Sequence, residues 1–406
     1  MRHNVTPADP ATEPSPVPGV SRNVYILGLV SLATDASSEM IYPLVPLFLT
    51  TVLGAPVAVV GLIEGLAEAT ASALKGVSGW LSDRIGRRRP LVLAGYGLAA
   101  IAKPLLALAS GWPLVLAARL LDRFGKGVRG SPRDALIGDS SPANLRGRAF
   151  GFHRATDQIG AVIGPLLALA LLPLFHQNLR TLFVAAFVPA AVGVAILTAV
   201  RETGRGPSPN AAPPGLRLRG TPTTFRRLLA VMLLFTLGNS SDMFLILRAQ
   251  QLGIGTGAVV LLFAVYNAVY SAASYPAGAL SDRIGRKRVM MAGLAVFALV
   301  YAGFGLVRGP GWLWLLFAVY GLYQGLTDGT SRALVVDLVS PELRGTALGV
   351  YAMVTGLAAL PASVIAGLLW QRVSPAAPFL YGAAMATLAC AAFLLVHSPP
   401  RPGRSS

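Results

Sequence analysis

Charged residues are scarce in this chain of 406 residues: Lys, Arg, Asp and Glu together make up 13% of the sequence. Soluble domains carry roughly 25% of such residues. Hydrophobic residues make up 54%, and the mean hydropathy is +0.62. The composition therefore argues against a soluble single-domain protein and is typical of an integral membrane protein.

Cysteine and the common catalytic motifs are also nearly absent. The one cysteine, Cys390, lies in an apolar run, so no intramolecular disulfide can form. The sequence contains no HExxH pair, no phosphate-binding glycine loop and no nucleophile–base set. We therefore expect neither an enzyme nor an ATP-driven pump. No cofactor is expected, because a proton gradient would supply the driving force.

The apolar residues that dominate the chain form twelve segments. A spanning helix needs about 20 mostly apolar residues. The segments that meet this length are 23–49, 56–81, 90–109, 112–134, 147–173, 179–200, 226–250, 256–281, 288–307, 311–335, 345–371 and 376–397. The sequence thus predicts an all-α membrane protein with an N-terminal bundle at 23–200 and a C-terminal bundle at 225–397.

Three segments lie outside these bundles. Residues 201–224 are rich in Gly, Pro and Ser and are expected to be a cytoplasmic linker. Residues 1–22 and 398–406 are expected to be cytoplasmic tails, the first of them disordered. No signal-peptide pattern precedes the first apolar run.

The net charge of +17 is distributed as expected for membrane topology and not for nucleic-acid binding. Lys and Arg resist translocation, so their clusters mark cytoplasmic loops. One side of the membrane would carry clusters at 84–89, 146–148, 201–227 and 283–288, whereas the other would carry isolated arginines such as Arg180 and Arg308. We expect both termini in the cytoplasm of a multi-pass cell-membrane protein, with a bacterial inner membrane as the setting.

Three stretches of the sequence occur twice. GWLSDRIGRRRP at 79–90 returns as GALSDRIGRKRV at 278–289, and SSEM at 37–40 matches SSDM at 240–243. Residues 139–151, which end in SPANLRGRAFG, match residues 337–349, which end in SPELRGTALG. The chain is therefore a tandem duplication, which is typical of secondary transporters whose substrate site lies between the repeats.

These repeats resemble the major facilitator superfamily (MFS) over essentially the whole chain after the first tail. The signature of that family, G-x-x-x-D-R/K-x-G-R-R/K between the second and third spans, is complete in both copies: Gly79, Asp83, Arg84, Gly86, Arg87 and Arg88, then Gly278, Asp282, Arg283, Gly285, Arg286 and Lys287. The resemblance implies two six-helix bundles with pseudo-twofold symmetry, alternating access, and a cytoplasmic gate formed by the signature. Arg133 is the expected partner of this gate.

Two further motifs match only in part. Arg123, Lys126 and Gly127 stand where the family has R-x-x-q-G in span 4. In span 5, the exporter pattern g-x-x-x-G-P-x-x-G-G retains Gly160, Gly164 and Pro165, while Ala168 and Leu169 replace its last glycines. The chain thus resembles a drug:proton antiporter whose signature is partly lost.

Ionisable residues inside spanning helices are costly and are therefore candidates for function. The candidates for proton coupling or for the cavity are Asp35, Glu39, Glu64, Glu68, Arg119, Asp122, Arg123, Lys126, Asp157 and Asp242. Some of these charges are expected to be structural, with Asp122 and Lys126 as an i,i+4 pair. For coupling, a carboxylate in a poorly hydrated cavity can bind and release a proton near neutral pH. Asp35 and Glu39 beside Arg123 or Arg119 fit that role best.

The second half carries fewer charges and more uncharged polar groups. The candidates for the substrate cavity are Asn239, Tyr266, Asn267, Tyr270, Tyr320, Tyr323 and Gln324. These side chains suit hydrogen bonding and stacking with an organic substrate. Ordinary packing, or an aromatic belt at the membrane surface, is the alternative for each tyrosine.

The sequence predicts a proton-coupled secondary transporter that exports small organic compounds. The alternative is a transporter of a polar or anionic metabolite or of a metal chelate, which the basic stripe of span 4 favours. His153 and Asp157 are too few for a metal site, and none is expected. The expected partners are the lipid bilayer, protons and a small-molecule substrate, without nucleic acid. The oligomeric state is left open, and a monomer is compatible with the sequence.

The repeat also places Glu39 and Asp242 at matching positions, so we hypothesise that they face each other across the cavity. The expected result of Glu39→Gln is loss of proton-driven transport, because a neutral amide cannot carry the proton. Uptake by proteoliposomes under an imposed proton gradient measures this. Unchanged coupling in the variant would place the proton site elsewhere.

Overall fold

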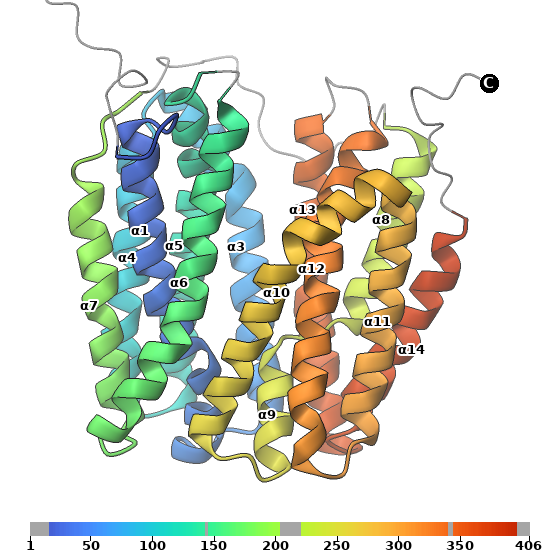
Figure 1. The fold of residues 1–406 in the computed structure, drawn as a ribbon. Coiled ribbons are helices and arrows are strands. Elements are labelled where there is room, and N and C mark those ends of the chain that lie inside the picture. Colours follow the sequence, from blue (N-terminus) through green and yellow to red (C-terminus); the bar gives the residue numbers. More distant parts are fainter. Residues whose placement is uncertain (1–15, 143–144, 204–220, 340–343, 396–406) are drawn as a thin grey trace, which may run out of the picture. The chain divides into compact units, whose positions relative to one another are not determined.

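The structure is a computed structural model that describes residues 16–142, 145–203, 221–339 and 344–395. Throughout these residues the regular structure is helical, as Figure 1 shows, which confirms the all-α prediction. Nine of the described helices are long and apolar enough to cross a membrane.

The helices of the first half follow the predicted spans closely. They are α1 (Arg22–Ile41), α3 (Val57–Ile85), α4 (Arg89–Ala107), α5 (Trp112–Asp139), α6 (Arg146–Leu174) and α7 (Leu179–Leu197). Short turns η1 (Tyr42–Leu44), α2 (Val45–Leu47) and η2 (Phe48–Val52) extend the first span beyond α1. Pro43 and Pro46 lie in these turns, where each removes a backbone donor that a regular helix would use.

The helices of the second half repeat this order. They are α8 (Thr223–Gly238), α9 (Met243–Gln251), α10 (Thr256–Ile284), α11 (Arg286–Leu306), the turn η3 (Pro310–Trp312), α12 (Leu313–Asp337), α13 (Arg344–Arg372) and α14 (Ala377–Phe393). Each pairs with a predicted span, but the seventh span is not one helix. It breaks between α8 and α9, at Asn239 to Asp242.

The break in the seventh span corrects the prediction of a continuous helix over 226–250. Four short polar residues, NSSD, occupy it, and such side chains compete with the helix for backbone hydrogen bonds. The Ser241 hydroxyl accepts a hydrogen bond from the amide of Met243 at 3.3 Å, where α9 starts. The matching sequence SSEM in the first half stays helical within α1. The repeat therefore predicts where the matching residues lie along the span, but not their backbone conformation.

The chain packs as two compact units. The first comprises Met1–Phe48 and Thr70–Pro214, and the second comprises Leu49–Ala69 and Gly215–Ser406. The boundary near residue 214 lies in the predicted linker. The start of α3 belongs with the second unit because it packs on α13: a Cβ on Gly65 would lie 2.9 Å from the Cα of Leu360.

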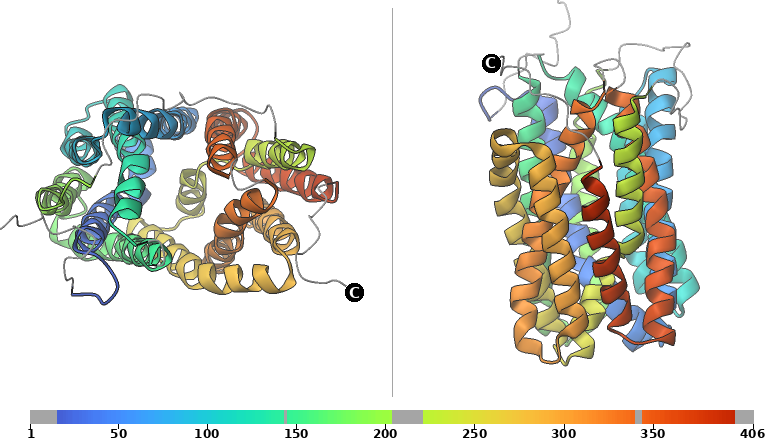
Figure 2. Two further views of the ribbon diagram at one scale, coloured as in Figure 1. Left: turned by 90° about the horizontal axis from the view of Figure 1, so that it is seen from above. Right: turned by 90° about the vertical axis from the view of Figure 1, so that its right-hand side faces the viewer.

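Helices run side by side within each unit, as the two further views in Figure 2 show. In the first unit α1 packs on α6 and α7, and α4 packs on α5 and α7. In the second unit α10 packs on α12, and α11 packs on α12 and α14. These contacts bring residues of α1, α4, α5, α6 and α7 together in one unit and those of α10, α11, α12 and α14 together in the other.

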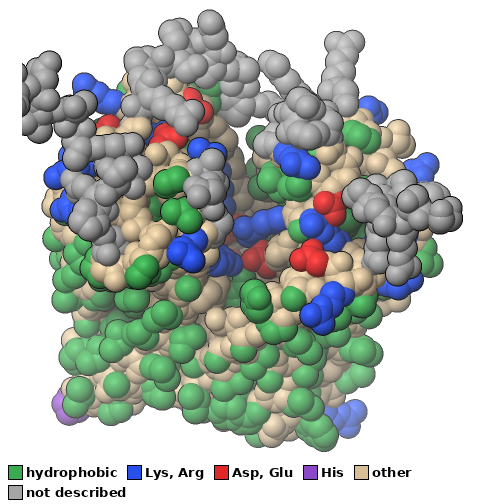
Figure 3. All heavy atoms as spheres, turned by 45° about the horizontal axis from the view of Figure 1, so that its top comes forward, with side chains coloured by type: hydrophobic (Ala, Val, Ile, Leu, Met, Phe, Trp, Pro, Cys, Tyr) green, Lys and Arg blue, Asp and Glu red, His purple; other side chains and the backbone are tan. Residues whose placement is uncertain are grey.

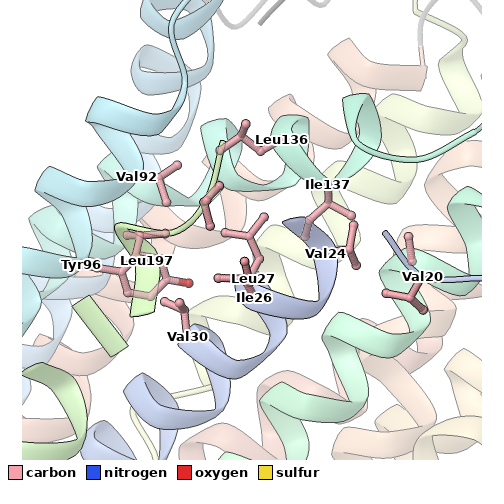
Figure 4. Close-up of a cluster of buried hydrophobic side chains, with 12 residues drawn as sticks. Val20, Val24, Ile26, Leu27, Val30, Val92, Tyr96, Leu136, Ile137 and Leu197 are labelled. Carbon is pink, nitrogen blue, oxygen red and sulfur yellow. The ribbon is translucent and has the colours of Figure 1, made fainter. Parts of the chain in front are cut away.

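A buried hydrophobic cluster joins one end of α1 to its neighbours in the first unit (Figure 4). Val24 and Leu27 of α1 meet Tyr96 of α4, Leu136 of α5 and Leu197 of α7, all of them at most 1% exposed. Burial of this many apolar side chains fixes the start of α1 against α4, α5 and α7.

Asn23, which is 1% exposed, adds polar links at the same end of α1. Its side-chain amide donates to the Ser140 hydroxyl at 3.1 Å and to the Arg201 carbonyl at 3.0 Å, and its oxygen accepts from the Arg201 amide at 3.0 Å. The first residue of the predicted linker is therefore held against α1.

Close helix contact at Gly164 explains the part of the span 5 motif that is retained. A Cβ at this position of α6 would lie 2.5 Å from the Ala36 carbonyl oxygen and 2.8 Å from the Met40 amide nitrogen. Small residues let membrane helices approach in this way, since lipid supplies no hydrophobic force between them. Gly160 contacts Leu32 and Ala36 of α1 in the same manner.

We expect Gly164→Ala to lower the free energy of unfolding by ~1–3 kcal/mol, because the added methyl group must push α6 away from α1. Gly151→Ala is the matched control on α6, since no described atom lies within 4 Å of its new Cβ. Thermal unfolding of the purified chain in detergent compares the two. Equal stability of both variants would contradict the close packing.

Candidate functional site

The first copy of the signature, residues 79–90, forms a hinge between α3 and α4, which we call the first hinge. Gly86 has φ +68°, a conformation that favours glycine. The Arg88 guanidinium lies 3.4 Å from the Asp83 carboxylate and also binds Asp139 at the end of α5. Arg88 and Asp139 are only 14% and 13% exposed. The first hinge is therefore tied to α5 by a largely buried ion pair.

A carboxylate beyond α7 completes the first hinge. Glu202 accepts hydrogen bonds from the backbone amides of Arg88 at 3.0 Å and Arg89 at 2.9 Å. These amides begin α4 and have no partner within that helix. A negative charge at a helix N-terminus is favourable. Glu202 is a functional residue that sequence reasoning missed, since its only signal was an acidic residue at the start of the linker.

The second copy, residues 278–289, forms the second hinge between α10 and α11. Gly285, with φ +104°, is the only residue between these helices, whereas three residues separate α3 from α4. Here Arg286 makes both ion pairs, at 3.7 Å from Asp282 and 3.0 Å from Asp337 at the end of α12. By sequence Arg286 matches Arg87, not Arg88. Because the second turn is shorter, the two ion pairs are made by the basic residue one position earlier in the signature.

The other signature residues have different surroundings. Arg84 lies 5.4 Å from the ring centroid of Trp80, and the Lys287 ammonium donates to the Leu394 carbonyl at 3.3 Å. Gly79 faces Ser131 of α5 closely, whereas a Cβ on Gly278 would have no described atom within 4 Å. Arg133, the partner expected for the gate, instead binds Asp134 at 2.9 Å. That expectation was wrong, because Asp83 is paired with Arg88 at the hinge.

Asp35 and Asp157 bring two carboxyl groups together inside the first unit, and we call them the acid pair. The two carboxyl groups are hydrogen-bonding neighbours, on α1 and α6 respectively. The Ser31 hydroxyl, one turn before Asp35, also donates to the Asp157 carboxylate. His153 Nδ1 lies 3.8 Å from Asp157. Both residues of the acid pair were predicted as coupling candidates, but their contact was not.

Basic residues of α5 surround the acid pair. Arg129 and Lys126 act electrostatically on Asp35, as does Glu39 one turn further along α1. Arg129 is 7% exposed, and its guanidinium carbon lies 4.3 Å from the ring centroid of Tyr96. The basic partners expected for Asp35 were Arg123 and Arg119. The structure brings Arg129 and Lys126 to it instead, because they lie one to two turns further along α5.

Asp122 forms a second cluster with α4. Its carboxylate lies 3.0 Å from the Lys103 ammonium and 3.8 Å from Arg119 of its own helix. Lys103, only 1% exposed, also donates to the Ser38 hydroxyl at 3.3 Å. The predicted pairing of Asp122 with Lys126 is therefore wrong. Helix α4 supplies the cation because it packs against α5 along its length.

Asp242 lies in the break between α8 and α9 of the second unit. Its carboxylate accepts hydrogen bonds from Tyr320 at 2.6 Å and from Tyr266 at 3.5 Å. The Asn239 amide donates to the Tyr323 hydroxyl at 3.3 Å. Four of the residues predicted for the substrate cavity thus lie around Asp242.

The remaining candidates of the second unit are placed separately. Tyr270 donates to Asp328 at 2.8 Å, and Arg332 neutralises that carboxylate at 2.8 Å. Asn267 is buried on α10, and Gln324 is partly buried on α12. Glu64, 5% exposed, and Glu68 lie on the part of α3 that packs with this unit. The proposed approach of Glu39 to Asp242 concerns residues of different units and stays a prediction.

The described residues contain no group of three His, Cys, Asp or Glu side chains that could hold a metal ion. Their chemistry is that of hydrogen bonds, ion pairs and aromatic contacts in helices that cross a membrane. Figure 3 shows Lys and Arg side chains near the ends of helices and largely hydrophobic flanks. Basic residues at helix ends and apolar flanks suit membrane-spanning helices.

Comparison with known proteins agrees with this description. The family model for the Major Facilitator Superfamily matches residues 27–248 and 228–406. The MFS-type transporter MJ1317 of Methanocaldococcus jannaschii is 38% identical over 375 residues, covering 91% of this chain and 93% of the relative. The multidrug resistance protein MdtH of Aeromonas hydrophila is 28% identical over 332 residues, covering 80% and 82%.

Solved structures share the fold at low identity. The nucleoside transporter NupG is 15% identical with a TM-score of 0.74, covering 92% of this chain and 99% of its own. The human organic anion transporter MFSD10 is 20% identical with a TM-score of 0.67 and the same coverage. These likenesses confirm the predicted fold class and carry no further assignment.

The ion pairs of the two hinges predict which arginine of each hinge contributes to the stability of the fold. We expect Arg88→Ala to lower the free energy of unfolding by ~1–3 kcal/mol, since it removes the guanidinium that pairs with the largely buried Asp139. Arg286→Ala should have a smaller effect, because Arg286 and Asp337 are 27% and 40% exposed.

Arg87→Ala and Lys287→Ala are the sequence-matched controls and should change stability little. Chemical or thermal denaturation of the full chain in detergent gives the values. If Arg87→Ala lowered the free energy of unfolding as much as Arg88→Ala, the two hinges would not differ in which signature position makes the ion pairs.

Proposed function

Because the chain belongs to the major facilitator superfamily, we propose that it is a proton-coupled exporter of small organic compounds that works by alternating access. Family and fold support a secondary transporter in general. The resemblance to proteins named multidrug resistance protein MdtH favours export of organic compounds within that class.

The acid pair is the observation that carries the proposed coupling to protons. Two carboxyl groups in contact inside a low-dielectric interior cannot both be ionised, so they share a proton. Nearby cations favour the ionised form of a carboxyl group. Movement of α1 or α6 past the basic residues of α5 would change this balance. The acid pair can therefore take up a proton in one conformation and release it in the other.

The residues around the acid pair give it a defined geometry. Ser31 and His153 fix Asp157 from two sides, so the carboxyl group of Asp157 is oriented toward α1. The Thr156 hydroxyl, one residue before Asp157, donates to the His153 carbonyl at 2.8 Å within α6. A coupling site requires such orientation, because a proton is transferred only over hydrogen-bonding distance.

The direction of transport and the topology belong to the same proposal. The basic hinges would face the cytoplasm, with both termini on that side of the cell membrane. Export then means that substrate enters a cavity open to the hinge side and leaves when the conformation reverses. The proton gradient drives the cycle as protons return through the acid pair.

A second candidate, transport of an anionic metabolite, is favoured by Arg129. This side chain is buried, and its NH1 atom has no hydrogen-bond partner among the described residues. A buried guanidinium with an unused donor suits a carboxylate or phosphate of a substrate. Identification of the transported substrate would distinguish between these two candidate functions.

We expect Asp35→Asn and Asp157→Asn each to reduce gradient-driven transport about tenfold or more, while substrate exchange at equal concentrations continues. Exchange needs conformational change but no net proton movement. The substrate is first found by thermal stabilisation of the full chain with a panel of drugs and metabolites. Transport and exchange are then followed in proteoliposomes that enclose a pH-sensitive dye.

Asp328→Asn is the control for this experiment, because Asp328 is a carboxylate of α12 in the other unit and is already paired with Arg332 at 2.8 Å. It should transport like the wild type. Full gradient-driven accumulation by both acid-pair variants would refute the proposed coupling site. Net substrate transport without any proton movement in the wild type would refute proton coupling itself.

A further inference from the structure

The break between α8 and α9 holds a carboxylate without a cationic partner. Among the described residues, no Lys or Arg forms an ion pair with Asp242, whose carboxylate accepts hydrogen bonds from the hydroxyls of Tyr320 and Tyr266. By contrast Asp328, which accepts a hydrogen bond from Tyr270 at 2.8 Å, is neutralised by Arg332. A buried carboxylate that is not neutralised is costly. The site therefore calls for a positive group from outside the chain or for a proton.

Negative charge around Asp242 is increased by α3. Glu64 and Glu68 both act electrostatically on the Asp242 carboxylate. Glu64 is 5% exposed, so its field is not screened by bulk water. A cation placed beside Asp242 would interact favourably with three carboxylates.

Aromatic faces surround the same position. The ring centroids of Tyr266 and Tyr320 lie 5.3 Å apart with planes inclined by 31°, and those of Tyr320 and Tyr323 are also 5.3 Å apart. Tyr301 lies 6.1 Å from Tyr320. Ring faces attract cations through their quadrupole, and a cluster of tyrosines beside a carboxylate is a cage for an organic cation.

Polar side chains of the break line this cage. Ser240 is 5% exposed and lies within hydrogen-bonding reach of the fully buried Tyr301 hydroxyl. The Asn239 side-chain oxygen is buried and has no hydrogen-bond partner among the described residues. Tyr301 lies near enough to interact with both Ser240 and Asp242. Buried polar groups normally have partners, so an unpaired amide oxygen in the same break as Asp242 indicates a bound molecule or water.

We propose that Asp242, Tyr266, Tyr320 and Tyr301 form a subsite that binds the ammonium group of an organic substrate. This proposal rests on the transport function and names the substrate class: an amine, protonated at neutral pH, on a flat or apolar body. The carboxylate pairs with the ammonium, the tyrosine rings cover its faces, and Ser240 and Asn239 supply acceptors for its remaining N–H groups. The apolar body would contact the rings of the cage.

Binding of three compounds with the same body and different charge tests the proposal. The probes are 1-naphthylmethylammonium, 1-naphthylmethanol and 1-naphthoate, added to the full chain in detergent at pH 7. We expect the ammonium compound to raise the thermal unfolding midpoint and to bind about tenfold or more tightly than the alcohol. No stabilisation by the ammonium compound, or equal binding of the alcohol or the naphthoate, would overturn the proposal.

Variants of the cage assign the binding to its residues. Asp242→Asn keeps the shape and should weaken ammonium binding about tenfold, with little effect on the alcohol. Tyr320→Phe keeps the ring and should cost less than Tyr320→Leu, which removes it. Asp328→Asn is the control, since the carboxylate of Asp328 is already paired with Arg332. Unchanged ammonium affinity in Asp242→Asn would also overturn the proposal, even if the protein is folded and transports.

These results are independent of proton coupling. If the protein bound naphthoate more tightly than the ammonium compound and gradient-driven transport were intact, the ammonium subsite would be refuted. The proposal of a transporter would be unaffected. Ammonium binding that persists in Asp35→Asn, where gradient-driven transport is lost, would show that the subsite and the coupling site are separate. The wild type could also bind none of the probes while the Asp242 carboxylate takes up and releases a proton as the pH changes. That result would identify Asp242 as a second proton site and refute the subsite.

Discussion

Every charge carried by a spanning helix must find its compensation inside the protein, because the hydrocarbon around it offers neither water nor counterions. The helices meet this requirement in different ways. Lys103 is neutralised by Asp122 on the next helix. Arg248 on α9 is 7% exposed and instead donates to the carbonyls of Phe304 and Val307 at the end of α11, each at 3.0 Å. In our proposal, the charges that are not fully satisfied in this way are the ones that bind protons or substrate.

That requirement explains why the two units differ. In the first unit, carboxylates and basic residues occur together on α1, α5 and α6. Protons can therefore pass between protein groups there, and charged side chains can change partners. In the second unit, a carboxylate meets tyrosines at a break in a helix, so compensation must come from elsewhere. Duplication gave both halves the same hinge signature and helix order. The intramembrane charges diverged, which divides coupling and substrate binding between the units in our proposal.

Sequence reasoning was reliable where local composition determines the outcome. Twelve apolar segments and two complete signatures were enough for the fold, and the acid pair was among the candidates because Asp35 and Asp157 interrupt apolar helices. It was unreliable where packing decides which neighbours meet. The partner of Asp122 lies nineteen positions earlier, on another helix. The active arginine of each hinge depends on the length of the turn, which the two similar sequences do not reveal. The break at Asn239 could have been inferred from NSSD, had these short polar residues been weighed against the helical pattern.

Glu202 ties the connection between the halves to the hinge. It lies beyond α7 in the sequence, yet it occupies the start of α4, while Asn23 holds Arg201, and the Thr203 and Ser140 hydroxyls lie 3.5 Å apart. The polypeptide from 201 to 203 is therefore part of the first unit and not of a free tether. If the gene were divided so that the halves are made as separate chains, the position of the cut would matter. A cut after Thr203 would leave the first hinge complete, whereas a cut before Glu202 would give that carboxylate to the other chain.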